Sequence, residues 1–136
     1  MKAAARMSRF PAVLFLATAI PAHATVIGLL PPGMDSSEAI AINNSGLVVL
    51  FASANGGPRK TWLRAPDGNI FDPGSPVGLP SATVTAINDL GHAVAIAGGG
   101  SISTVAVRSP AGTWTLPIPS ARALPTGIND DGVIVG

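Results

Sequence analysis

A short phrase, Ile-Asn-x-x-Gly, occurs three times in this chain of 136 residues. The copies lie at residues 42–46, 87–91 and 128–132, and their asparagines are 45 and 41 residues apart. Recurrence at a period of this size is the signature of a repeat architecture, in which stacked units bury a continuous core. The phrase therefore predicts that the chain is built from similar, neighbouring units.

A second marker supports the same register. Arg-x-Pro-x-Gly occurs at residues 64–68 and again at 108–112, 44 residues later. Together the two markers predict three parts, which are repeat 1 at 37–80, repeat 2 at 81–124 and a partial repeat 3 at 125–136. An N-terminal connector over 25–36 would precede them.

Turn signals divide each repeat into short apolar runs. The expected strands are 39–43, 47–52, 61–64 and 69–71 in repeat 1, 83–88, 92–97, 102–108 and 113–116 in repeat 2, and 126–129 and 133–135 in repeat 3. The run Gly98-Gly99-Gly100-Ser101 reads as a hairpin turn, because it lacks the Gly-Lys-Ser/Thr ending of a phosphate-binding loop.

Several expected strands lack alternation of apolar and polar residues, notably 47–51 and 93–97. Strands of this kind are usually buried on both faces, as they are where sheets stack against neighbouring sheets. We therefore expect an all-β fold of four-stranded antiparallel units. Their length of about 40–45 residues matches the blades of a β-propeller. Two units and part of a third do not close such a ring, and a β-sandwich is the alternative.

The repeated phrase uses residues suited to tight turns. Glycine adopts positive φ without steric cost, and asparagine side chains bond back to the nearby backbone. The six structural turn positions are Asn43, Gly46, Asn88, Gly91, Asn129 and Gly132.

Residues 1–24 have the pattern of a secretory signal peptide. Three basic residues precede an apolar stretch over 10–20, and Ala22-His23-Ala24 fits the small-x-small cleavage rule, which leaves Thr25 as the new N-terminus. An uncleaved anchor is the alternative, but Pro21 interrupts the run of roughly 20 apolar residues that a spanning helix needs. We expect export to the periplasm or the medium, with no membrane span after cleavage.

The chain without this leader has five basic and seven acidic residues, a net charge of −2. The five cations are dispersed and form no basic patch, so we expect no nucleic-acid partner. No cysteine is present, so disulfide bonds cannot contribute to stability.

Candidate catalytic residues are few. His92 is the one histidine after the leader, and a nucleophilic triad would pair it with Ser101 or Ser103 and with Asp89. No Gly-x-Ser-x-Gly elbow is present. A strand-end histidine is the plainer interpretation, and we expect no catalytic residue here.

Carboxylates gather at the expected turns, where they offer oxygen ligands of the kind calcium binds. No calcium-loop motif is present, and aspartate is also a common turn residue. We expect neither a metal site nor a cofactor. Paired carboxylates for glycoside hydrolysis could come only from Asp67, Asp72, Asp89, Asp130 and Asp131. Trp62 and Trp114 could stack on a sugar, although core packing between units is the favoured interpretation.

Residues 37–49 and 128–136 resemble the core of the HAF family of bacterial extracellular repeats, whose pattern runs Ser-x-Ala-x-x-Ile-Asn-Asp-x-Gly-x-Val-Val-Gly. The resemblance covers residues 37–136. The triplet His-Ala-Phe that names the family is replaced by Lys-Thr-Trp at 60–62 and by Thr-Val-Ala at 104–106. The resemblance implies an exported, propeller-like repeat protein and carries over no catalytic residue.

These observations favour a non-catalytic binding or structural module, the N-terminal portion of a longer propeller, with its working surface on the loops at one end of the units. The alternative function is a secreted hydrolase that acts on glycans through loop carboxylates. A third interpretation is a fragment without a function of its own. An open edge at 133–135 could also mediate self-association.

Overall fold

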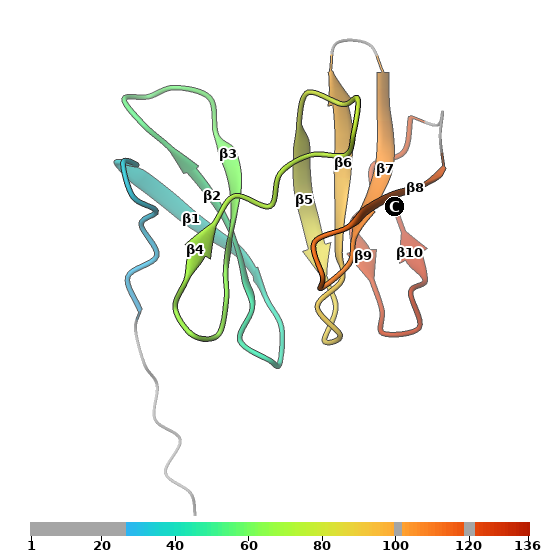
Figure 1. Ribbon diagram of the computed structural model, residues 1–136, viewed down its shortest axis with the longest axis horizontal. Helices are drawn as coiled ribbons and strands as arrows, with labels where there is room; N and C mark the ends of the chain where they lie inside the picture. The colour runs from blue at the N-terminus through green and yellow to red at the C-terminus, as the bar shows by residue number, and fades with distance from the viewer. Residues whose placement is uncertain (1–26, 100–101, 119–121) are drawn as a thin grey trace, which may run out of the picture.

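The computed structural model describes residues 27–99, 102–118 and 122–136. In this part of the chain ten β-strands form two four-stranded sheets and a two-stranded ribbon (Figure 1). Every pairing is antiparallel, and each sheet follows the order of the chain. No helix of sufficient length and apolarity to cross a membrane occurs among these residues. The expected leader over 1–24 lies outside them.

The bounds of the strands match the expected runs closely. The first sheet contains β1 (Ser36–Ile42), β2 (Val48–Ser53), β3 (Lys60–Arg64) and β4 (Ile70–Phe71). The second contains β5 (Ala82–Ile87), β6 (Ala93–Gly99), β7 (Ile102–Arg108) and β8 (Trp114–Ile118), and the ribbon contains β9 (Gly127–Ile128) and β10 (Ile134–Val135). The prediction of an all-β chain of four-stranded antiparallel units is confirmed.

The two sheets share the same irregularity in their first strand. The register of β1 against β2 shifts between Ala39 and Ala41, and that of β5 against β6 shifts between Val84 and Ala86. A bulge of this kind bends a strand and increases its twist. Because the shifts are 45 residues apart, as the first two repeated phrases are, both sheets bend at equivalent places.

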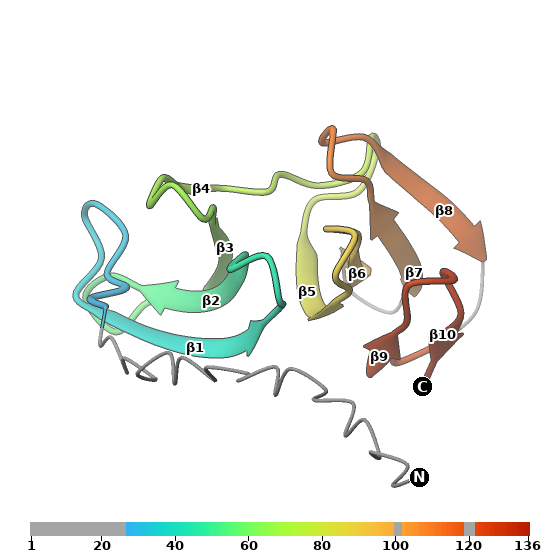
Figure 2. The ribbon, with the colours of Figure 1, turned by 90° about the horizontal axis from the view of Figure 1, so that it is seen from below.

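The core lies between the sheets. Val49 and Leu63 from the first sheet meet Val84, Ala93 and Ala95 from the second, and all five side chains are buried. Strand β5 contacts β1 on one side and β9 on the other. Figure 2 shows the first strands of the units along its lower side, with β4 and β8 along its upper side. The sheets are therefore stacked face to face, and their first strands are neighbours.

The first two residues of the expected turn over 98–101 belong to a strand. Gly98 and Gly99 belong to β6, and Gly99 pairs with Ile102 of β7. A methyl group on Gly99 would lie 2.8 Å from Cγ of Pro80, so only glycine lets the connector before β5 approach this closely. The predicted place of Gly98 and Gly99 in a turn is wrong, because close backbone approach leaves no local sequence signal.

Candidate functional site: the ladder of repeat turns

Each repeated phrase forms the hairpin turn between the first two strands of its unit. In the first unit the Gly46 N–H donates to the Asn43 carbonyl at 3.0 Å, and the Asn43 N–H donates to the Leu47 carbonyl at 3.1 Å. Gly46 has φ of 86°, a conformation that favours glycine. The same two bonds and a positive φ recur at Asn88 with Gly91 and at Asn129 with Gly132.

The asparagine side chain closes its own turn. Its Oδ1 accepts the backbone N–H four residues later, at 2.8 Å in all three units; the donors are Leu47, His92 and Val133. This bond satisfies a donor that the tight turn would otherwise leave without a partner. An aspartate could make the same bond, so this role alone does not require asparagine.

The amide nitrogen of the same side chain donates to the next unit. Nδ2 of Asn43 donates to the Asn88 carbonyl at 2.8 Å, and Nδ2 of Asn88 donates to the Asn129 carbonyl at 2.9 Å. Asn88, with a unit on each side, is only 4% exposed. The asparagine at this position thus acts as acceptor within its turn and as donor to the next turn, a combination that a carboxylate cannot provide.

The residues that follow the three asparagines form a second row of hydrogen bonds between units. The Asn44 N–H donates to Oδ1 of Asp89 at 2.8 Å, and Nδ2 of Asn44 donates to Oδ2 of Asp89. The Asp89 N–H in turn donates to Oδ1 of Asp130 at 2.9 Å. Their place in turns predicted turn residues or metal ligands, and this contact between units was not predicted, although the two aspartates recur at the repeat spacing.

A charge-swap experiment tests the Asn44–Asp89 contact. Asn44→Asp should lower the melting temperature because it sets two carboxylates against each other. Adding Asp89→Asn should restore most of the loss, since the amide and the carboxylate then exchange places. Thermal unfolding of the two single variants and the double variant measures the effect. A double variant no more stable than Asn44→Asp would show that the two side chains do not interact.

The second sequence marker packs onto the first. A methyl group on Gly46 would lie 3.8 Å from Cβ of Pro66, and one on Gly91 would lie 3.5 Å from Cγ of Pro110. The proline of Arg-x-Pro-x-Gly therefore lies against the glycine of Ile-Asn-x-x-Gly in both sheets. The two markers are 20 residues apart from Gly46 to Pro66 and 19 residues apart from Gly91 to Pro110, and their contact in space accounts for this nearly constant separation.

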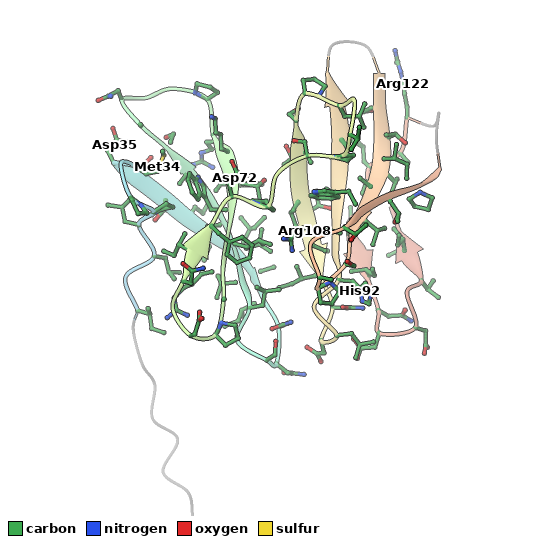
Figure 3. All side chains as sticks on the ribbon, viewed as in Figure 1. Met34, Asp35, Asp72, His92, Arg108 and Arg122 are labelled. Atoms are coloured by element: carbon green, nitrogen blue, oxygen red, sulfur yellow. The ribbon has the colours of Figure 1, made fainter. Side chains whose placement is uncertain are left out.

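The arginine of this marker bridges the two sheets. The Arg108 guanidinium lies 5.5 Å from the centre of the Phe71 ring, and its Nε donates to the Pro73 carbonyl at 3.3 Å. Nε1 of Trp114 donates to the same carbonyl at 3.1 Å. Burial lowers the pKa of Arg108 from its usual value. Figure 3 shows Arg108 between the sheets, and Trp114 likewise packs against the core between units.

Among the described residues, the structure does not bring His92 and Ser103 of the expected triad together. His92 precedes β6, at the end where the turns gather (Figure 3). Ser103 pairs with Gly98, near the other end of β6. Ala93 and Gly98 are five positions apart along β6, which is roughly 17 Å of strand. Ser101 lies outside the described residues.

The candidate carboxylates are engaged in separate turns. Asp67 accepts the Asn69 N–H at 2.9 Å and Asp72 accepts the Gly74 N–H at 2.7 Å. Within 27–99, 102–118 and 122–136, no three His, Cys, Asp or Glu side chains come together in a way that could hold a metal ion. The contacts of these residues are those of turn and inter-unit bonding.

No protein-family model matches the chain, and neither curated proteins nor solved structures yield a match.

Proposed function

We propose that this chain is an exported, non-catalytic repeat protein that serves as a binding or structural module, with its units arranged as blades of a β-propeller. One observation carries the proposal. The polar residues that the units share, Asn43, Asn88 and Asp89 among them, have their side chains bonded to the turn of their own unit or of a neighbouring one. Side chains used in this way hold units in register rather than act on a substrate.

The arrangement of the sheets supports the propeller interpretation. Blades of a propeller are four-stranded antiparallel sheets stacked face to face, with the first strand of each blade nearest the axis. Here β5 lies between β1 and β9, and the core is formed by the facing sides of two such sheets. We also propose that the chain belongs with the HAF repeats, which residues 37–49 and 128–136 resemble.

Export follows from the leader-like pattern over 1–24. Expression of the whole chain in a bacterial host, followed by fractionation and N-terminal sequencing, tests it. We expect the protein in the periplasm or the medium, beginning at Thr25. A chain that stays in the cytoplasm with Met1 intact would contradict export.

The competing proposal is a hydrolase that uses turn carboxylates on glycans. Incubation of the exported protein with a panel of polysaccharides, with reducing ends as the readout, separates the two. We expect no release above a blank. Release that is lost in Asp89→Asn, while the circular dichroism spectrum and melting temperature stay close to those of the parent protein, would overturn the non-catalytic proposal.

A further inference from the structure

We infer that the outer edge of the first sheet binds an extended, acidic peptide segment of a partner protein, which adds to the sheet as a strand beside β3. The inference rests on the proposed function and specifies the kind of partner that the module binds. We name this surface the β3 edge, and it consists of Lys60, Thr61 and Trp62. It lies on the side of β3 that faces away from β1 and β2.

Strand β3 is longer than its outer partner. It covers Lys60–Arg64, whereas β4 pairs with it only at Leu63 and Arg64. The N–H and C=O groups of successive residues in a strand point to alternate edges, so within 60–62 at least one residue directs both groups outward. No described residue bonds the backbone of 60–62 on that side. An edge of this kind is a template for pairing with another chain.

The second unit shows which structure fits beside these residues. The outer strands β4 and β8 begin with equivalent pairs in the two units. Strand β8 then continues, and Ile118 pairs with Val105, the counterpart of Thr61 44 residues later. The place beside Thr61 is therefore taken by a strand in the second unit, and no described strand takes it in the first.

A turn after β4 leads the chain away from β3. Oδ1 of Asp72 accepts the Gly74 N–H at 2.7 Å, and Gly74 has φ of 71°. The connector then crosses to the second sheet (Figure 2). A cavity of about 180 Å³ remains between the start of β3 and the connector, and Thr61 and Ser75 are among its lining residues. This cavity gives room for the side chain that an added strand places opposite Thr61.

The β3 edge is held in place by the second sheet. Thr61 is 6% exposed, and its Oγ1 accepts the Val84 N–H of β5 at 3.2 Å. Leu63, two residues later, belongs to the core between the sheets. A surface that is already ordered loses little conformational freedom when a partner binds. This order favours recognition through main-chain hydrogen bonds, which is how an extended peptide adds to a sheet edge.

The side chains of the β3 edge select an acidic segment. Lys60 is exposed and forms no ion pair with any described residue, whereas Arg59 is already paired with Glu38 at 2.7 Å. Opposite charges on directly facing residues stabilise a pair of strands, and like charges destabilise it. An antiparallel segment would place an apolar residue opposite Trp62, then a small residue opposite Thr61, and then an acidic residue opposite Lys60.

Nuclear magnetic resonance of the isotope-labelled exported protein, titrated with the peptide acetyl-Ser-Val-Thr-Glu-Ser-amide, tests the inference. We expect chemical-shift changes centred on the amides of 60–62 and slower hydrogen exchange there at saturation. Lys60→Glu should weaken binding of this peptide about 5-fold or more and favour a peptide with lysine in place of glutamate. Arg122→Glu makes the same charge change at an exposed site between β8 and β9, and it should leave binding unchanged.

Two N-methylated peptides separate strand addition from attraction between charges alone. One carries N-methyl groups at valine and glutamate, the other at threonine, and their charges are equal. Only one of them should lose binding, because alternate N–H groups of an added strand face the β3 edge.

Three results would overturn the inference: no shift changes, changes centred outside 60–62, or equal behaviour of the two methylated peptides. Equal binding of the glutamate and lysine peptides to the parent protein would also overturn it. If Lys60→Glu fails to fold by circular dichroism, Lys60→Ala replaces it. Neither export nor glycan release enters these readouts, so the proposed function is judged separately.

Discussion

Replacement of Asn88 by alanine is expected to lower the free energy of unfolding by about 2–3 kcal/mol. Each hydrogen bond contributes about 1 kcal/mol, and a buried group left without its partner costs about 1–3 kcal/mol. Asn88 is buried and makes two such bonds, as acceptor from the His92 N–H and as donor to the Asn129 carbonyl. Denaturant unfolding followed by circular dichroism measures the change.

Two further variants separate the roles of this asparagine. Asn129→Ala removes the same bond within the turn at an exposed site, and we expect a loss of about 1 kcal/mol or less. Asn88→Asp keeps the acceptor for His92 but removes the donor to the next unit. If the contact between units matters, Asn88→Asp destabilises clearly more than Asn129→Ala. Equal stability of Asn88→Asp and the parent protein would reduce Asn88 to a turn residue.

Replacement of Leu63 by alanine is expected to cost about 2–5 kcal/mol, the range for a large apolar side chain removed from a packed core. Leu63 is 1% exposed, and its side chain packs against residues of the second sheet. The cavity would open between the sheets, where Ala93 and Ala95 are too small to fill it. Thermal and denaturant unfolding measure the loss.

Leu116→Ala is the matched control, because Leu116 lies on β8 and is 39% exposed. Surface substitutions of this kind usually change stability by about 0.5 kcal/mol. Hydrogen exchange adds a test of position, since Leu63→Ala should reduce the protection of amides in β6 as well as in β3. Similar losses for Leu63→Ala and Leu116→Ala would contradict a core shared by the two sheets.

The strands could be predicted because their turns carry local signals. Gly46, Gly91 and Gly132 adopt positive φ and mark the ends of strands, and Asn55 and Gly56 do the same before β3, with φ of 52° and 67°. Strand ends without such a signal were predicted less well. β1 begins at Ser36, three residues earlier than expected, where the Ser36 and Ser53 hydroxyls bond at 2.8 Å.

The turn-to-turn contacts between units could not be predicted, because their partners are 41 or 45 residues apart. Asp89 has the same local sequence whether it binds a metal, shapes a turn or accepts the Asn44 N–H. Only the stacking of the sheets decides among these roles. Arg108 is a similar case. The repeat of Arg-x-Pro-x-Gly predicts where an arginine recurs in the sequence, but not that its guanidinium lies over the Phe71 ring. The repeat pattern gave the fold, and the stacked structure was needed for the site.

The most direct test of the account uses the two tryptophans of the chain. Trp62 is in the first sheet and Trp114 is in the second, so 5-fluorotryptophan labelling gives one fluorine NMR signal for each unit. Trp62→Phe identifies the signals, and denaturant titration follows both in the same sample. If the ladder and shared core join the units, both native signals disappear together in the parent protein and separate in Asn43→Ala. Signals that already disappear at different denaturant concentrations in the parent protein would contradict the account.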